Sequence, residues 1–144
     1  MQGLFVKLPV GDPAASMRFF ESLGFAFNPA FTDVSAACLI LGPQYQAMLL
    51  TRRRFADFTP YRRVDAHRET QVLVALQLDS RARVEAMTAR AQAAGGRLFR
   101  SAEDHGWMYS HVFQDLDGHI WEPFHMDPAA LQAARANNPT AGAV

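Results

Sequence analysis

The sequence predicts an α+β fold in which one β-α-β-β-β module occurs twice, in residues 1–51 and in residues 70–127. Two observations support this prediction. Each module opens with a strand in which apolar residues alternate, and each of these strands leads into a capped helix that ends at glycine. The two modules share this order of elements rather than their side chains. Residues 52–69 are expected to connect them, and residues 128–144 to form a C-terminal helix and tail.

The first module begins with an alternating strand from Leu4 to Val10. The face opposite its aliphatic residues carries Phe5, Lys7 and Pro9. We expect a helix from Pro13 to Leu23, because Asp12 before a proline is a typical helix start and Gly24 a typical stop. Two short strands, residues 35–41 and 46–51, complete the module.

The second module repeats this order. Its opening strand, residues 71–78, places Leu73, Ala75 and Gln77 on the face opposite its aliphatic residues. Ser80 is expected to cap the helix, and Gly95-Gly96 to end it. A short strand at 97–100 precedes a hairpin with strands at 109–114 and 119–124 and a polar turn at 115–118. If the two sheets lie side by side, the faces opposite the helices enclose a cavity.

Composition indicates a soluble globular protein. Apolar residues make up 49% of the chain and charged residues 19%, while the formal net charge is zero. A neutral chain offers no basic field for nucleic acid or for a membrane surface, so neither partner is expected. The single cysteine, Cys38, cannot form an internal disulfide, and we expect a cytoplasmic location.

Glu122 is the central functional candidate, because an acid flanked by Trp121 and Pro123 needs a cation, a metal or a proton. With a four-residue turn, the hairpin register pairs His111 with Glu122 on the cavity face. Tyr109, Phe113, Ile120 and Phe124 fall on the same face. Such a pair suits proton transfer or ligand binding, and the alternative is a polar pair that only satisfies its own hydrogen bonds. A slip of one residue would move His111 to the other face.

His119, Glu122 and His125 form an H-x-x-E-x-x-H pattern, which suggests zinc only on a helix. On a strand, Glu122 faces away from both histidines, which lie roughly 20 Å apart. The strand assignment therefore argues against a metal site here.

Two basic features leave several interpretations open. Lys7 either neutralises Glu122 across the cavity, presents a cation to an anionic ligand, or extends into solvent. The arginines between residues 52 and 70 are interleaved with aromatic residues and with acids. This mixture favours a solvated face or a lid over the cavity, with a nucleic-acid patch as the weaker alternative.

Two motifs carry a family resemblance. The stretch VGDPAASMRFFESLGF at Val10–Phe25 and the stretch QDLDGHIWE at Gln114–Glu122 resemble the opening helix and the hairpin of the vicinal oxygen chelate superfamily. That group includes glyoxalase I, the bleomycin-resistance proteins and the extradiol dioxygenases. The resemblance covers residues 1–128 and implies paired βαβββ modules and a homodimer.

In metal-dependent members of that superfamily, four ligands line the cavity, typically His, Glu, His and Glu. The resemblance places these positions at Phe5, near Leu49 in the run MLLT, near Leu73, and at Glu122. Phenylalanine and leucine have no lone pair to donate, and one carboxylate does not hold a divalent ion. We therefore expect no metal and no other cofactor.

The sequence thus favours a metal-independent binding protein of the bleomycin-resistance type, with an apolar or aromatic small molecule as its ligand. The predicted pocket consists of Phe5, Leu49, Leu73, Tyr109, Phe113 and Phe124, with Lys7, His111 and Glu122 orienting the ligand. Catalysis stays open. The alternative is a glyoxalase-like lyase or isomerase, or an extradiol-type dioxygenase, in which His111 and Glu122 act as acid and base or hold a relocated metal. A third possibility, a purely structural dimer, predicts a filled core without a cavity.

Overall fold

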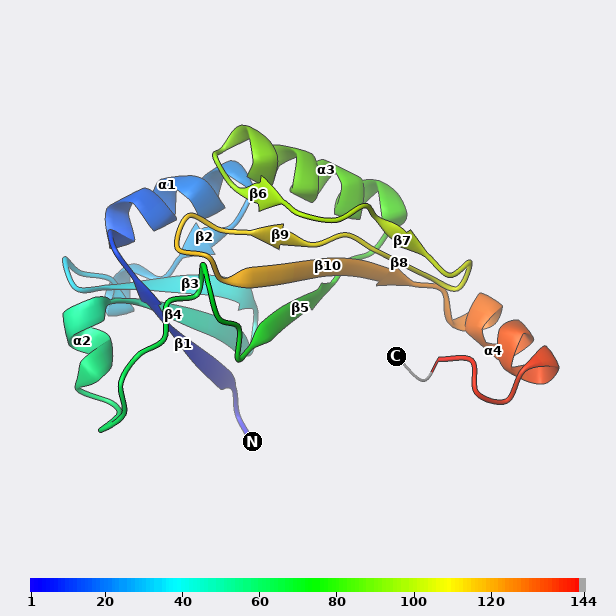
Figure 1. Cartoon of the computed structure of the whole chain (residues 1–144), viewed down its shortest axis with the longest axis horizontal. Helices are drawn as coiled ribbons and strands as arrows, with labels where there is room; N and C mark the ends of the chain where they lie inside the picture. The colour runs from blue at the N-terminus through cyan, green and yellow to red at the C-terminus, as the bar shows by residue number, and fades with distance from the viewer. Residues whose placement is uncertain (143–144) are drawn as a thin grey trace.

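Two β-sheets lie under two helices, α1 and α3, which cover the same side of both sheets (Figure 1). The structure is a computed structural model and describes residues 1–142. Its α+β architecture and its twice-repeated order of elements confirm the predicted fold class. The last two residues of the predicted tail, 143–144, lie outside the described residues.

The first sheet has the strand order β1-β4-β3-β2. Its strands are β1 (Leu4–Val10), β2 (Ala26–Phe27), β3 (Ala36–Gly42) and β4 (Tyr45–Thr51), and β1 runs parallel to β4. Helix α1 (Pro13–Ser22) begins as predicted, because the Asp12 side chain accepts a hydrogen bond from the Ala14 backbone N–H at 2.9 Å. A short 3₁₀ turn, η1 (Pro29–Phe31), follows β2.

The second sheet has β10 (Ile120–Met126) at its centre, paired in parallel with β5 (Leu73–Gln77). On its other side, β10 pairs with β9 (Phe113–Gln114) and β8 (Met108–Ser110), and β6 (Arg97–Leu98) and β7 (Glu103–Asp104) form the outer edge. Ser80 caps α3 (Arg81–Ala93) by accepting a hydrogen bond from the Arg83 N–H. The C-terminal helix α4 (Pro128–Asn137) lies where the sequence predicts it.

One core lies between the helices and both sheets. The rings of Phe20 on α1 and Trp121 on β10 are 5.0 Å apart, and Met87 on α3 belongs to the same cluster. The alternation predicted for the opening strands is confirmed, since Leu8 and Val10 are buried while Phe5, Lys7, Leu73 and Ala75 are exposed on the opposite side. We call that side the open face.

The predicted hairpin register is wrong by one residue. Gln114 pairs with Ile120 and Phe113 pairs with Trp121. The turn has one more residue than predicted, because the Asp115 N–H donates to the His119 carbonyl at 3.0 Å and Gly118 adopts a φ of 90° inside the turn. Continuing this register places Val112, and not His111, opposite Glu122.

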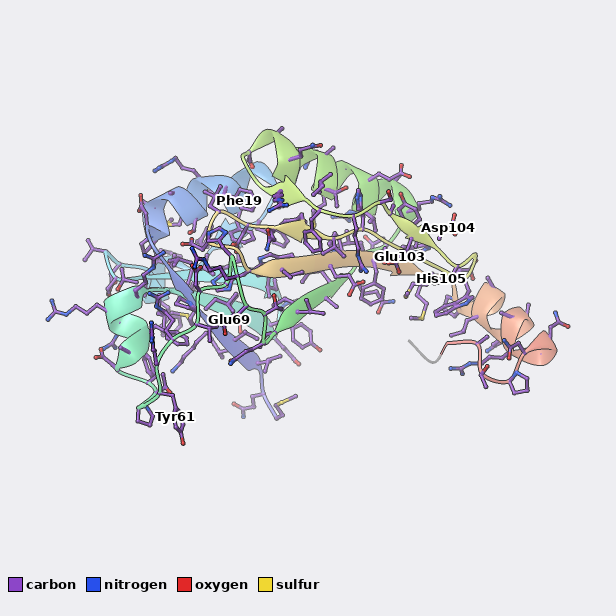
Figure 2. All side chains as sticks on the ribbon, viewed as in Figure 1. Phe19, Tyr61, Glu69, Glu103, Asp104 and His105 are labelled. Atoms are coloured by element: carbon purple, nitrogen blue, oxygen red, sulfur yellow. The ribbon has the colours of Figure 1, made fainter. Side chains whose placement is uncertain are left out.

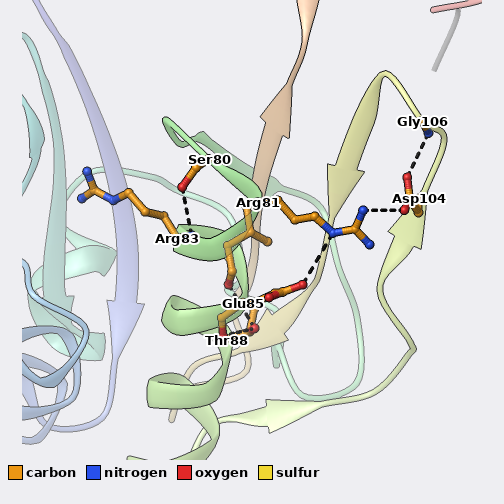
Figure 3. A network of polar contacts seen from close by, with 8 residues as sticks. Ser80, Arg81, Arg83, Glu85, Thr88, Asp104 and Gly106 are labelled. Atoms are coloured by element: carbon orange, nitrogen blue, oxygen red, sulfur yellow. Dashed lines mark hydrogen bonds and ion pairs between the residues drawn. The ribbon is translucent and has the colours of Figure 1, made fainter. Parts of the chain in front are cut away.

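Arg81 is the first residue of α3 and lies on the helix side of the second sheet (Figure 3). Its guanidinium contacts Asp104 at 2.7 Å and Glu85 at 3.6 Å, and lies 4.0 Å from the centre of the Tyr109 ring. The Gly106 N–H also donates to Asp104, and these contacts hold the pKa of the Asp104 carboxyl below its ordinary value, with the Gly106 hydrogen bond as the larger cause. Arg81 thereby ties the start of α3 to the β7–β8 hairpin.

The connection between the modules contains a helix that the sequence did not predict, α2 (Arg52–Ala56). Residues 57–72 then cross from the first sheet to the second, which we call the connecting segment. Within residues 1–142, no helix has both the length and the apolar character that a membrane crossing requires.

Candidate functional site

A cavity of about 400 Å³ lies between β1, the connecting segment and the start of β10. Its walls are partly apolar and are formed by Leu8, Pro9, Phe55, Val64, Val72 and Ile120. Its charged lining residues are Lys7, Arg62, Arg63 and Glu69. The connecting segment therefore lies over a cavity on the open face. Its role as a lid stays a prediction.

Close packing holds the connecting segment over the cavity. A Cβ atom on Gly118 would lie 2.6 Å from the His67 backbone nitrogen and 2.7 Å from the Ala66 carbonyl carbon, so only glycine fits beneath the segment. The Lys7 ammonium lies 3.2 Å from the centre of the Phe58 ring, which is a cation–π contact. The segment is thus anchored on both modules.

The hairpin turn also joins the two modules. Asp117 accepts a hydrogen bond from the Gly11 N–H at 2.7 Å, and His119 donates from Nε2 to the Pro9 carbonyl at 2.7 Å. Asp115 is buried and accepts hydrogen bonds from its own turn and from Trp121 Nε1 at 2.9 Å. Burial raises the pKa of the Asp115 carboxyl, and the neighbouring His119 opposes that shift. Asp115 and Asp117 therefore have structural roles that fix the edge of the cavity.

Glu122 meets a cation that the sequence reasoning missed. Arg100 Nη2 lies 3.5 Å from Glu122 Oε1, and Arg100 Nη1 lies 2.8 Å from Glu103 Oε1. The Glu122 side chain is 26% exposed. Figure 2 shows Glu103 and His105 at the β7–β8 hairpin, right of centre, and Tyr61 and Glu69 on the connecting segment, left of centre. Glu122 thus belongs to a charged cluster next to the cavity, not to its lining.

His111 is not the partner of Glu122. Its backbone N–H donates to the Pro123 carbonyl at 3.2 Å, and its ring Nε2 donates to the Arg100 carbonyl at 3.1 Å. No hydrogen bond or ion pair links His111 to Glu122 within residues 1–142. The pairing predicted from the four-residue turn is therefore wrong, and the His111 ring instead holds the backbone at Arg100.

Three of the predicted pocket residues lie on the helix side. Leu49 and Phe113 are fully buried in the core, and Tyr109 stacks under Arg81. Their prediction as cavity residues is wrong. Phe5 and Leu73 are 52% and 59% exposed on the open face, and Phe124 shares the Glu122 side of β10. Lys7 is the predicted residue that lines the cavity.

Comparison with known proteins decides the family. The family model of the glyoxalase/bleomycin resistance protein/dioxygenase superfamily matches residues 4–122. The chain belongs to this superfamily. No curated protein sequence matches the chain significantly.

Solved structures share the superfamily fold. A hypothetical protein from S. aureus has a TM-score of 0.74 and 22% identity, and the match covers 87% of this chain and 94% of that one. A glyoxalase-related enzyme from Fulvimarina pelagi has a TM-score of 0.72 and 24% identity, covering 87% and 88%. A glyoxalase/bleomycin resistance protein/dioxygenase family enzyme from Burkholderia phytofirmans PsJN has a TM-score of 0.69 and 16% identity, covering 85% and 96%. At these identities, the likeness concerns the fold.

The internal repeat corrects one of the four positions at which superfamily members hold a metal. Lys7 precedes the cap Asp12 by five residues and pairs with Met48, whereas Ala75 precedes the cap Ser80 by five residues and pairs with Glu122. Met48, and not Leu49, is therefore the counterpart of Glu122. Leu49 pairs with Leu8 and faces the core.

The donor set at these four positions does not fit a divalent metal. Phe5 and Leu73 have no donor atom, Met48 offers a thioether, and the Glu122 carboxylate already contacts Arg100. Hard and borderline divalent ions need three or four nitrogen, oxygen or thiolate ligands. Within the described part of the chain, no group of three or more His, Cys, Asp or Glu side chains is placed to hold a metal ion.

Sequence reasoning missed Arg100 as the partner of Glu122 and Val72 as a cavity residue. Arg100 lies in an irregular stretch between β6 and β7, so no periodic pattern indicates where its side chain points. Ile120 and Val72 line the cavity only because the connecting segment folds back on them. The prediction of Ile120 on the cavity face with Glu122 is confirmed, because Ile120 lines the cavity.

Proposed function

We propose that this superfamily member is a metal-independent binding protein for an organic small molecule, which occupies the cavity beneath the connecting segment. The cavity of about 400 Å³ is the observation that supports this function. Its volume falls within the range of roughly 300–1,000 Å³ that is typical of ligand sites, and its mixture of apolar walls and a few charged groups is typical as well. A purely structural protein with a filled core would lack such a space.

The ligand, in this proposal, rests its apolar part on Val72 and Ile120 and meets the Lys7 ammonium. Phe5, Leu73 and Phe124 form the neighbouring open face, where they would contact a ligand that extends beyond the cavity. Glu122 lies two residues along β10 from Ile120, which is about 7 Å in a strand. It would contact only such an extended ligand.

We favour binding over catalysis because the side chains of the two proposed catalytic residues, His111 and Glu122, do not face each other. Proton transfer by His111 and Glu122 requires both side chains within hydrogen-bonding reach of a substrate. The hairpin register places Val112 opposite Glu122, and the His111 ring is engaged with the Arg100 carbonyl. Lyase, isomerase and dioxygenase activities therefore have less support than binding.

The cavity is tested with N-phenyl-1-naphthylamine, a neutral fluorophore that brightens in apolar sites. We expect saturable binding to the wild-type protein, and the same binding after dialysis against EDTA. Val72→Trp should abolish binding because the indole fills the cavity. Val34→Trp is the matched control, since Val34 is 95% exposed and outside the cavity lining. Equal binding by both variants, or loss of binding after EDTA, would contradict the proposal.

Homodimerisation and the cytoplasmic location stay predictions. Sedimentation velocity over a range of protein concentrations would check the dimer. A filter-binding assay with RNA and DNA would check the expected absence of nucleic-acid binding by the arginine-rich connecting segment.

A further inference from the structure

The cavity has an unbalanced set of charges. Three cations, Lys7, Arg62 and Arg63, line it together with one acid, Glu69. Within residues 1–142, none of these four side chains has an opposite charge within 4.0 Å. The chain as a whole has no net charge, so this excess of positive charge is local.

Glu69 is the acid of the lining, and three further acids, on β10 and close to the cavity arginines in sequence, already contact other arginines. Arg100 contacts Glu122, Arg54 contacts Asp57 at 3.0 Å, and Arg68 lies 3.8 Å from Asp65. The Lys7 ammonium meets the face of the Phe58 ring instead of a carboxylate. A cation–π contact attracts the ammonium but leaves its charge in place. Lys7 therefore remains available to an anion.

Lys7 is also distinctive in the sequence. It is the only lysine, and all other basic residues apart from histidine are arginines. It lies on β1, a regular strand paired along its length with β4, so its side chain is directed to the cavity by a rigid element. Arg62 and Arg63 line both this cavity and a more open groove of about 730 Å³, and thus lie at the boundary between the two.

We infer that the ligand of this cavity is an organic anion. Its carboxylate, sulfonate or phosphate group binds the Lys7 ammonium, the arginines Arg62 and Arg63 attract it at the outer boundary, and its apolar part contacts Val72 and Ile120. This inference rests on the proposed binding function and specifies the ligand class. Charge-assisted hydrogen bonds are the stronger kind, and arginine is well suited to carboxylate and phosphate.

Lys7 could also act by holding the connecting segment in place, and this role must be distinguished from anion binding. Its contact with Phe58 helps to hold the connecting segment over the cavity, so removal of Lys7 affects the segment as well as the charge. Phe58→Leu removes the same contact and keeps the ammonium. If Lys7 acted only through the segment, Phe58→Leu and Lys7→Met would have the same effect on every ligand.

The test compares two probes with the same ring system. 1-Anilinonaphthalene-8-sulfonate carries a sulfonate, and N-phenyl-1-naphthylamine does not. For the wild-type protein we expect the sulfonate to bind about tenfold more tightly, as one charge-assisted contact implies. Lys7→Met should abolish this preference, and Lys7→Arg and Phe58→Leu should retain it. Arg18→Met is the control for overall charge, because Arg18 is an exposed residue of α1 outside the cavity.

The single lysine gives a second readout that does not depend on fluorescence. Acetic anhydride acetylates the Lys7 amine, and peptide mass spectrometry compares its rate with that of the exposed Met1 α-amino group. At a ligand concentration about nine times its Kd, we expect the sulfonate probe, 2-naphthoate and 2-naphthyl phosphate to slow acetylation of Lys7 about tenfold, because only the unliganded fraction reacts. The neutral probe should slow it less.

Two outcomes would overturn the inference, and they are distinguishable. If both probes bind equally well and Lys7→Met changes neither affinity, the binding function stands and the anionic ligand class is wrong. If neither probe binds and Lys7 acetylation is unaffected by any anion, the binding function itself fails and the inference fails with it.

Discussion

Arg100 joins Glu122 to Glu103, with Nη2 at 3.5 Å from Glu122 and Nη1 at 2.8 Å from Glu103. The acid that the sequence marks as buried among apolar residues is thus partly exposed and ion-paired. Its apolar neighbours Trp121 and Pro123 are buried in the core, on the opposite face of β10 from Glu122. Glu122 consequently needs neither a metal nor a histidine partner to be accommodated in the sheet.

The Arg100–Glu122 pair should contribute little to stability, because it is long and both side chains contact solvent. A double-mutant cycle with Arg100→Met and Glu122→Gln, measured by urea unfolding, should give a coupling free energy below about 1 kcal/mol. Glu122→Gln should also leave binding of N-phenyl-1-naphthylamine unchanged, since Ile120 is the residue of β10 that lines the cavity. A large loss of probe binding would place the carboxylate in the site.

Gly118→Ala should displace the connecting segment. The new Cβ atom would collide with the backbone of Ala66 and His67, and the positive φ adds about 1–3 kcal/mol of strain. Gly106→Ala is the matched control, because Gly106 also has a positive φ but no atom within 4 Å of the position that a methyl group would occupy. Trypsin should cleave at the arginines of the segment faster in Gly118→Ala than in Gly106→Ala. Equal cleavage rates would show that the segment does not rest on Gly118.

Asp115→Asn should destabilise the protein by about 1–3 kcal/mol, the cost of a buried donor without an acceptor. The carboxylate accepts from Trp121 Nε1 and from two backbone N–H groups, and an amide group has only one acceptor atom to replace both oxygens. Asp117→Asn is the control, because one amide oxygen still accepts from the Gly11 N–H. Chemical denaturation followed by tryptophan fluorescence measures both. An equal effect of the two substitutions would contradict the role assigned to Asp115.

The ionised Asp104 carboxylate should stabilise the folded state in a pH-dependent way. The Gly106 N–H and the Arg81 guanidinium lower its pKa below 3.8, so this contribution is fully present above pH 3.8 and is lost as the pH falls through the lower folded-state value. A carbon-13 NMR titration of the carboxyl should show a midpoint below 3.8 in the wild-type protein. Arg81→Met should raise that midpoint only in part, because the larger cause, the Gly106 hydrogen bond, remains. An unchanged midpoint would show that Arg81 has no influence.

The order of the elements could be predicted from local signals. Asp12 and Ser80 begin α1 and α3 through side-chain caps, and Gly24 and Gly95 follow their ends with positive φ. The alternation in β1 and β5 assigns the core and the open faces correctly. These features depend on residues close in sequence, so the sequence alone suffices.

The candidate site could be predicted only in part, and two of the errors are of the same kind. One extra residue in the 115–119 turn moves His111 away from Glu122, and a shift of one residue exchanges Met48 for Leu49. Because side chains alternate along a strand, a single-residue error reverses the face. The cavity itself depends on the packing of the connecting segment on Gly118, a contact between residues far apart in sequence for which no local signal exists.

The common core beneath α1 and α3 contains residues from both halves of the chain. Phe20 from one half packs against Trp121 from the other, so each half produced alone would leave its side of this contact in water. We therefore expect neither half to fold alone, although each has a complete β-α-β-β-β order. If the chain were cleaved within the connecting segment, its two fragments would have to associate in order to fold. A ligand bound beneath that segment would contact both fragments.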